Sequence, residues 1–358
     1  MQDFFKKLKQ VVEINSYTKN KAGVDKVGRV FQQWFEELGY KTKRYPRELI
    51  GDHLYFISPK KDGKKVLFLG HLDTVFPQGE FESYHEDDEW VYGAGVCDMK
   101  GGNLVAYEAL KQAGKIENID VLLVSDEETG SDDSKYLTKK LAKNYDECLV
   151  FEAAGANMEV VVARKGVGTF FVDIEGKASH SGVRYSDGVN ANLEASQKLI
   201  KLQSLTDLTK GTTVNVGLIE GGIGANTISP KAKLTFEIRY ETTDERDRVL
   251  QEIDSIVSTS FVKGTKATLS GGIQRDVMQE NQRQKDLIKT LENISNQTIL
   301  TEKRGGVSDA NIISSCGVTT LDGFGPYGDG DHTVKERAKK SSFDSRINLV
   351  TKYIENLS

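Results

Sequence analysis

Three apolar runs, each closely followed by residues that can bind a metal or move a proton, constrain the fold of this chain more than any other feature. The runs are KVLFLG (65–70), VLLVS (121–125) and CLVFEA (148–153), and they show little alternation of polar and apolar residues. Continuous runs of this kind are typical of strands that are buried on both faces of a sheet. Helical patterns lie between them, so we predict an α/β fold with a mostly parallel sheet.

The pattern changes near residue 168. The segments after it predict the order strand, helix, strand, strand, helix, strand, which is that of a ferredoxin-like domain. These segments are residues 169–176, 188–203, 212–219, 231–240, 243–259 and 266–271. We therefore predict a larger domain made of residues 1–167 and 281–358, with a smaller α+β domain inserted at residues 168–280.

Local patterns add three helices to the first part of the larger domain and one turn. Amphipathic spacing predicts helices over residues 3–14, 25–38 and 101–114. The sequence KDGK at 61–64 predicts the turn of a β-hairpin. Two histidines that match no motif, His53 and His85, are expected at the surface.

Composition excludes several classes of protein. The 358 residues carry a net charge of -5, and the lysine pairs are scattered among acids, so we expect no nucleic-acid partner. No apolar run reaches the roughly 18 residues of a membrane span, and the N-terminus lacks the features of a signal peptide. Cys97, Cys148 and Cys316 cannot all pair and show no CxxC spacing, which indicates buried thiols in a reducing, cytoplasmic compartment.

Side chains suited to metal binding stand at the ends of the apolar runs and in two glycine-rich loops. The carboxyl ends of parallel strands meet at one edge of a sheet, so these side chains are expected to converge. Converging carboxylates repel one another unless divalent cations compensate their charge. The residues are His71 and Asp73 after the first run, Glu127 and Glu128 after the second, Glu152 in the third, and Asp98 and His332 in the loops YGAGVCDMKGG and GPYGDGDHTVKE.

The composition of this set indicates the kind of metal site. Two histidines and several carboxylates, with no cysteine, suit catalytic zinc, manganese or cobalt better than structural zinc. Two glycine clusters, at 93–95 and 221–224, lack the full GxGxxG pattern after a strand, so a dinucleotide site is not expected.

The order of the motifs resembles the glutamate carboxypeptidase branch of the two-zinc exopeptidase family, which also holds aminoacylases, acetylornithine deacetylase, succinyl-diaminopimelate desuccinylase and tripeptidases. The resemblance covers nearly the whole chain. Its motifs are GHLDTVFP (70–77), YGAGVCDMKGG (92–102), SDEETGS (125–131), FEAA (151–154), RKGVG (164–168), GKASHSG (176–182), FEIRY (236–240) and the region from SDAN (308–311) to HTVKE (332–336).

The resemblance implies two divalent metal ions, most simply Zn²⁺, with Co²⁺ or Mn²⁺ as alternatives, and a role for each residue of the set. Asp98 resembles the carboxylate that bridges both metals. The other implied roles are His71 and Glu152 on one metal, Glu128 and His332 on the other, Asp73 as the acid that orients His71, and Glu127 as the general base. Glu336 is expected to orient His332.

The resemblance also implies roles for residues outside the metal set. His180, in the inserted domain, resembles a histidine that reaches the active site of the partner subunit, so we expect a homodimer and a lid or dimerisation role for that domain. Asn226, Arg239 and Arg304 resemble positions that bind the free carboxylate of a substrate. An arginine fork matches the geometry of a carboxylate.

These observations predict a metal-dependent hydrolase that cleaves an amide or peptide bond next to a free carboxylate. The substrate is expected to be a small peptide or an N-acyl amino acid, and an exopeptidase of glutamate-carboxypeptidase type is the first choice. The alternative is an N-acyl-amino-acid deacylase of the acetylornithine or succinyl-diaminopimelate type. A binding module without activity is the non-enzyme alternative. FEAA lacks the proline that often follows this glutamate, and GVRYSDGVNAN replaces a commoner proline-containing sequence near His180, which weakens the choice of substrate only.

Overall fold

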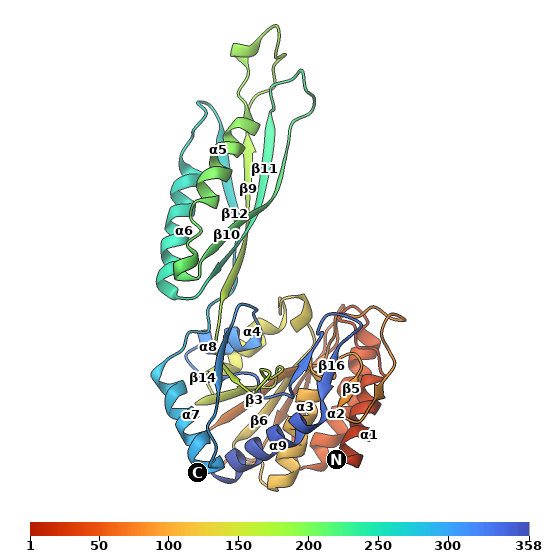
Figure 1. The fold of residues 1–358 in the computed structure, drawn as a ribbon. Helices are drawn as coiled ribbons and strands as arrows, with labels where there is room; N and C mark the ends of the chain where they lie inside the picture. The colour runs from red at the N-terminus through yellow and green to blue at the C-terminus, as the bar shows by residue number, and fades with distance from the viewer. Residues whose placement is uncertain (358) are drawn as a thin grey trace. The chain divides into compact units, whose positions relative to one another are not determined.

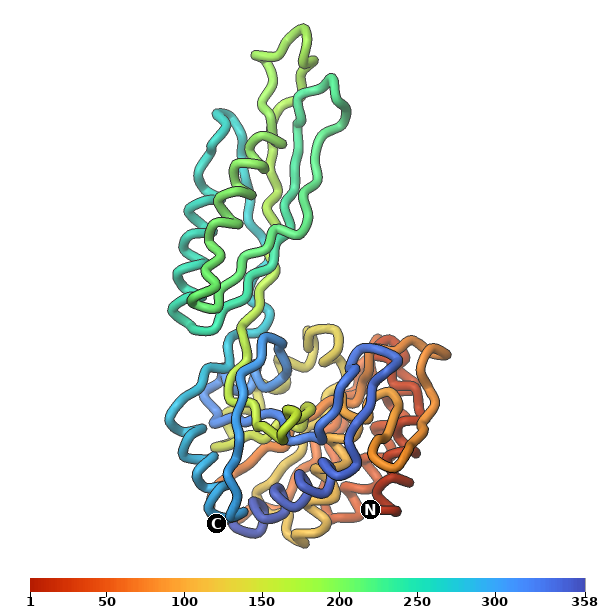
Figure 2. The backbone as a smooth tube through the Cα atoms, in the orientation of Figure 1, coloured from red at the N-terminus to blue at the C-terminus, as the bar shows by residue number. Residues whose placement is uncertain are grey.

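The computed structural model describes residues 1–357, which divide into two compact units (Figures 1 and 2). Unit 2 contains Arg164–Gln279 together with the short segment Gly305–Val307. Unit 1 contains the rest of the described chain. Within this described range, no helix is both long and apolar enough to cross a membrane.

A six-stranded sheet forms the centre of unit 1. Its order is β1-β2-β6-β3-β7-β14, with parallel pairing from β6 through β14 and antiparallel pairing of β1 and β2 at one edge. Every residue of β3, β6 and β7 is buried, which confirms the prediction of a mostly parallel sheet covered on both faces. The bounds are β1 Lys41–Tyr45, β2 His53–Ile57, β3 Val66–His71, β6 Ile119–Val124, β7 Glu147–Val150 and β14 Thr319–Leu321.

Amphipathic helices surround this sheet (Figure 1). Helix α3 packs against α1 and α9, and α4 packs against α8, so apolar faces meet in one core that includes Phe31, Phe68 and Phe343. The bounds are α1 Gln2–Val12, α2 Lys21–Glu37, α3 Lys100–Ala113, α4 Ser134–Ala142, α7 Gln282–Ser295, α8 Asp309–Ser315 and α9 Lys340–Glu355.

Two small sheets complete unit 1. One has the order β15-β16-β5-β4, and in the other β13 pairs with β8. The bounds are β4 His85–Glu86, β5 Trp90–Tyr92, β15 Gly328–Asp329, β16 Arg337–Lys339, β8 Val160–Arg164 and β13 Thr301–Arg304.

Three local predictions are wrong. Residues 61–64 do not turn a hairpin, because β6 lies between β2 and β3 in the sheet. His53 is fully buried rather than exposed: its Nδ1 accepts a hydrogen bond from the Ser125 amide (3.2 Å) and its Nε2 lies 2.9 Å from Asp133 Oδ1. Cys316 is exposed, whereas the other two cysteines are buried as expected.

Unit 2 has one antiparallel sheet, β10-β11-β9-β12, with α5 and α6 on the same face (Figure 1). The order of elements along the chain is the predicted one. Buried and half-buried residues alternate along β11, and Leu234, Phe236 and Ile238 join the core of the unit. The bounds are β9 Gly166–Glu175, α5 Ala191–Gln203, β10 Thr213–Gly221, β11 Lys231–Tyr240, α6 Thr243–Ser258 and β12 Lys266–Arg275.

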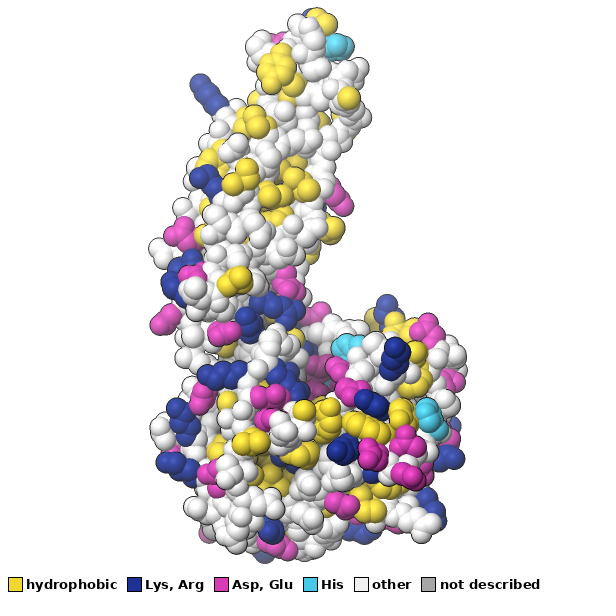
Figure 3. All heavy atoms as spheres, in the orientation of Figure 1, with side chains coloured by type: hydrophobic (Ala, Val, Ile, Leu, Met, Phe, Trp, Pro, Cys, Tyr) yellow, Lys and Arg dark blue, Asp and Glu magenta, His cyan; other side chains and the backbone are white. Residues whose placement is uncertain are grey.

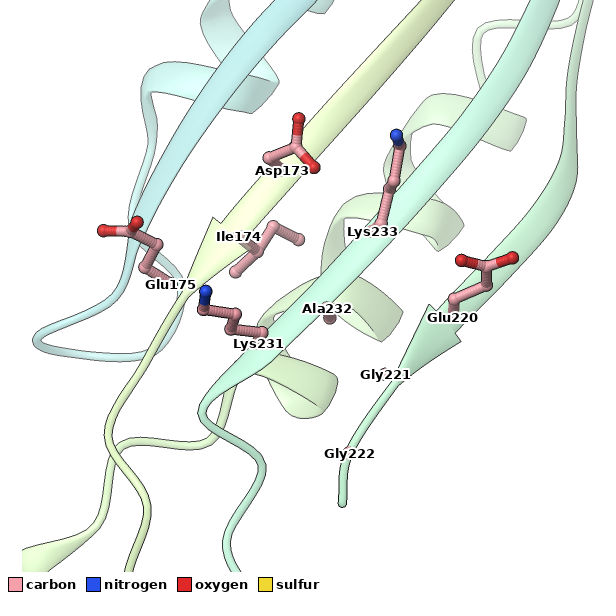
Figure 4. A pocket seen from close by; sticks show the side chains of 9 residues that line it. All are labelled: Asp173, Ile174, Glu175, Glu220, Gly221, Gly222, Lys231, Ala232 and Lys233. Atoms are coloured by element: carbon pink, nitrogen blue, oxygen red, sulfur yellow. The ribbon is translucent and has the colours of Figure 1, made fainter.

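One end of this sheet carries alternating charges (Figure 4). Asp173 and Glu175 on β9 stand opposite Lys233 and Lys231 on β11, and Glu220 on β10 stands opposite Lys233. These residues line a cavity of about 460 Å³. Opposite charges on neighbouring strands stabilise the register of the sheet.

Candidate metal centre

Three neighbouring strands of the central sheet deliver side chains to one edge. His71 is the last residue of β3. Glu127 and Glu128 belong to a short 3₁₀ turn that begins three residues after the last residue of β6, and Glu152 follows β7. Because β6, β3 and β7 are adjacent and parallel, their carboxyl ends lie together.

The small sheet of unit 1 brings in two more side chains. Asp98 lies in the loop between β5 and α3, and His332 lies in the turn between β15 and β16. Strand β16 pairs with both β5 and β15, so the loops at their ends are neighbours although they are far apart in the sequence.

Asp98 lies between two sets of potential ligands. Its Oδ1 is 3.1 Å from His71 Nε2, and its Oδ2 is 3.3 Å from His332 Nε2. His71 Nε2 also lies 3.8 Å from Glu152 Oε1, and His332 Nε2 lies 3.1 Å from Glu128 Oε2. The five residues therefore form two groups that share one carboxylate.

Protons on the histidines and on some of the acids reduce the repulsion between the carboxylates of this cluster. Burial alone would raise the pKa of Asp98, but hydrogen bonds with His332 and His71 hold it well below its usual value. The bonds to Asp98 and Glu128 raise the pKa of His332 to about 11. Burial beside Asp98 raises the pKa of Glu128 to about 8 and that of Glu152 well above its usual value.

The donor set fits divalent metal ions. One ligand atom each from His71, Asp98 and Glu128 lie within 4.8 Å of one another. Imidazole nitrogens combined with carboxylate oxygens suit zinc, and also manganese or cobalt. Acids that are otherwise kept neutral by burial gain a partner of opposite charge when a cation binds.

Metal binding is expected to release protons. At pH 7, His332 (pKa about 11) and Glu128 (pKa about 8) are protonated in the metal-free chain, and metals bind only the unprotonated forms. Metal affinity should therefore fall as the pH is lowered from 8 to 6. Calorimetric titration of the metal-free chain with Zn²⁺ in two buffers of different ionisation enthalpy measures the protons released. Equal heats in both buffers, with no pH dependence of affinity, would contradict this expectation.

Asp73 connects the two sides of the centre. His71 Nδ1 lies 3.0 Å from the Asp73 carbonyl oxygen and 3.4 Å from its Oδ1. The Asp73 carboxylate also accepts hydrogen bonds from the amides of Glu127 and Glu128, both 3.3 Å, and from Thr18 Oγ1 at 2.7 Å. One fully buried acid thus holds both the ring of His71 and the turn that carries Glu127. Thr18 carries no motif, so its part in this network was not predicted.

Two of the predicted residues lie together in unit 2. The backbone of His180 pairs with that of Thr227, and the Ser181 amide donates to the Asn226 carbonyl at 3.0 Å. The Gly182 amide donates to His180 Nδ1 at 3.2 Å. This bond makes Nδ1 an acceptor, so Nε2 carries the proton of the neutral ring and is a hydrogen-bond donor.

Each of the two predicted arginines contacts a backbone carbonyl. In unit 2, Arg239 Nη1 donates to the Gly305 carbonyl at 3.0 Å, and its Nε donates to Glu237 Oε1 at 2.7 Å. In unit 1, Arg304 Nη1 donates to the Ala153 carbonyl at 3.0 Å, directly after Glu152. Both arginines therefore also hold loops in place.

One expectation within the centre is wrong. The carboxylate of Glu336 does not orient His332; it accepts hydrogen bonds from the amides of Gly95, Cys97 and Asp98. No side-chain pattern in the sequence indicates these contacts, because their donors are backbone groups.

Comparison with known proteins relates most of this chain to one family. Residues 67–356 match the family described as peptidase family M20/M25/M40. Carboxypeptidase G2 from Pseudomonas sp. (strain RS-16) is 26% identical over 367 residues, covering 98% of this chain and 88% of that protein. Succinyl-diaminopimelate desuccinylase from Helicobacter hepaticus is 25% identical, covering 86% and 85%. The structure of aminopeptidase PepT from Bacillus cereus superposes with a TM-score of 0.82 at 22% identity, covering 99% and 98%.

Proposed function

Since the chain belongs to peptidase family M20/M25/M40, and is thus a hydrolase of the metallopeptidase and deacylase class, we propose that it is a two-metal exopeptidase that releases a C-terminal acidic residue. The observation that carries the proposal is the position of Asp98, with one carboxylate oxygen toward His71 and the other toward His332. A carboxylate placed in this way can bridge two ions, and zinc is the first choice for this mixed donor set.

In this proposal the metals, when bound, polarise the scissile carbonyl and lower the pKa of the attacking water. Glu127 takes a proton from that water and passes it to the leaving amine. Its amide is held by Asp73, which fixes the turn that carries its side chain. The Nε2–H of His180 supplies a donor for the negative oxygen of the tetrahedral intermediate.

The length of strand β11 supports an active dimer. His180 and Asn226 lie beyond one end of the strand, whereas Arg239 lies next to its other end. The eight residue-to-residue steps of extended strand from Lys231 to Arg239 span about 27 Å. A dipeptide is only about 7 Å long, so one substrate cannot touch all three residues of a single subunit. His180 and Asn226 of one subunit, with Arg239 of the other, would satisfy this geometry.

The free edge of unit 2 supports a second copy of the chain as the partner. Strand β10 is at the edge of its sheet and exposes Leu218 (58%) and Ile219 (53%). Leu193 and Ile200 of the adjoining helix α5 are exposed as well, and hydrophobic side chains gather on the visible face of unit 2 (Figure 3). An apolar edge of this kind is suited to pairing with an identical edge.

The surroundings of His180 favour an acidic substrate over an acyl-ornithine. Lys177, Arg184 and Asp187 line a cavity of about 520 Å³ beside His180, so its lining carries two cations and one acid. A cationic lining attracts a second carboxylate and repels an ammonium group. The remaining deacylase candidate is a succinyl-diaminopimelate type, whose succinyl group is anionic.

A substrate panel tests the proposal. With Zn²⁺, Mn²⁺ or Co²⁺ present, kcat/KM for dipeptides ending in glutamate or aspartate should exceed that for N-acetylornithine by about 10-fold or more, the effect of one charge-assisted hydrogen bond. N-succinyl-diaminopimelate and N-acylglutamates belong in the same panel. A preference for N-acetylornithine, or for N-succinyl-diaminopimelate, would overturn the carboxypeptidase assignment in favour of the corresponding deacylase.

A further inference from the structure

Glu336 is a buried acid of unit 1 that lies outside the proposed ligand set. Its exposed fraction is 1%. Its Oε2 accepts a hydrogen bond from the Gly95 amide (3.0 Å), and its Oε1 accepts from the amides of Cys97 and Asp98, both 3.1 Å, as well as from Cys97 Sγ at 3.4 Å. Both oxygens therefore face the backbone of the loop that ends at Asp98.

The small sheet explains why Glu336 reaches this loop. Strands β5 and β16 pair in antiparallel register, with Tyr92 opposite Arg337, and the Gly93 amide donates to the Glu336 carbonyl at 3.3 Å. The chain then curls around the carboxylate through Gly95, whose φ of +85° is in the region that favours glycine. A Cβ at Gly95 would lie 2.8 Å from Lys100 Cγ, so any larger residue there would crowd the Lys100 side chain.

The backbone of Glu336 also takes part in the turn that carries His332. His332 is four positions before Glu336, in a turn closed by hydrogen bonds from the Thr333 amide to the Gly330 carbonyl (3.0 Å) and from the Glu336 amide to the Thr333 carbonyl (3.1 Å). The turn is therefore tied at its base to the loop that carries Asp98. The backbone of Glu336 thus borders the turn of His332, whereas its carboxylate binds the loop of Asp98.

The contacts indicate a carboxylate that holds a loop rather than one that binds a metal. Three backbone amides and the Cys97 thiol donate to the two oxygens of Glu336, so each oxygen is bonded to the loop. We propose that Glu336 is a positioning residue that holds Asp98 between the two metal ions by binding the amides of residues 95–98. The inference rests on the proposed function, in which Asp98 is the bridging ligand.

Two variants separate positioning from charge. Glu336→Gln keeps the shape of the side chain but places an NH₂ group against one side of the amide cluster. Glu336→Asp keeps the charge but is one methylene too short to reach all three amides. If Glu336 acts by position, both variants should weaken the binding of at least one of the two ions. If it acts only by charge, the aspartate should behave like the wild type.

The test uses Co²⁺ as a spectroscopic probe of the full-length chain. We expect two ions per wild-type chain, and at least 10-fold weaker binding of the weaker ion in both variants, as is usual when the partner of a ligand is removed. The visible absorption of bound Co²⁺ should change and kcat should fall, with KM little affected. Asp120→Asn is the matched control: it alters another buried acid of unit 1 that accepts a backbone hydrogen bond, from the Ser58 amide at the opposite end of β6, and should leave Co²⁺ binding unchanged.

The outcomes are distinguishable. If folded Glu336→Gln and Glu336→Asp both show the wild-type Co²⁺ affinity and spectrum, the positioning role is overturned and the proposed function is left intact. The same conclusion follows if Co²⁺ binding is weaker in the glutamine variant alone. A lower melting temperature with unchanged Co²⁺ binding would assign Glu336 a purely structural role. A wild-type chain that binds no Co²⁺ at all would instead refute the proposed function.

Discussion

Replacement of Glu127 by glutamine is expected to leave both metal positions occupied and to lower kcat by about 10³-fold, within the usual range for loss of a general base. Glutamine has nearly the same shape as glutamate and keeps the amide contact with Asp73, but it cannot accept the proton of the attacking water. Metal content measured by atomic spectroscopy, together with kcat on the best substrate of the panel, checks both halves of the expectation.

The neighbouring residue provides the matched control for this variant. Glu128→Gln changes the same functional group one position along the same turn, but its carboxylate faces His332 and Asp98. It should therefore lose metal as well as activity. Substantial turnover in Glu127→Gln would remove Glu127 from the role of base, and metal loss in both variants would make the two residues equivalent ligands.

Replacement of His180 by alanine should lower kcat by about 10²-fold or more, the usual cost of losing an oxyanion donor, without loss of metal. If His180 acts across a dimer, the defect can be repaired by mixing. Co-refolding His180→Ala with Glu127→Gln should produce mixed dimers with one complete site, formed by Glu127 of one chain and His180 of the other. Random association should restore about a quarter of the wild-type kcat.

The mixing experiment has a clear negative outcome. If both variants refold and associate but their mixture shows only the sum of their separate activities, His180 acts within its own chain or not at all. An active monomer in sedimentation analysis would contradict the dimer directly. A third chain that carries both substitutions is the control, because mixing it with Glu127→Gln should restore nothing.

Much of the fold could be predicted because the burial of a strand determines the pattern of apolar residues in its sequence. The runs that become β3, β6 and β7 are buried on both faces and are mainly apolar, and the alternation in β11 marks a sheet covered on one face. The convergence of His71, Glu128 and Glu152 follows from the same strands, since parallel neighbours end at the same edge. The roles of these residues as ligands stay predictions.

What could not be predicted depends on contacts without a side-chain pattern. Gly305–Val307 belongs to unit 2 although both flanking segments belong to unit 1. Within this segment the carbonyls of Gly305 and Gly306 accept hydrogen bonds from Arg239 and Arg164. The turn at 61–64 has hairpin residues, yet pairing with β6 decides the sheet order. His53 is buried because the Ser125 amide and Asp133 satisfy its ring.

Asp73 and Glu336 accept hydrogen bonds from backbone amides, and this has a consequence for how the sequence around such a site can change. Every residue except proline presents the same N–H group. Substitution at Cys97 therefore leaves its amide donor to Glu336 in place, whatever the new side chain. Sequence drift in these loops can alter the lining near a substrate while the metal ligands keep their spacing. These backbone hydrogen bonds thus allow the substrate to change while the metal ligands stay in place. Proline at each of residues 95–98 in turn would remove one N–H group and would show which of them the metal ligands require.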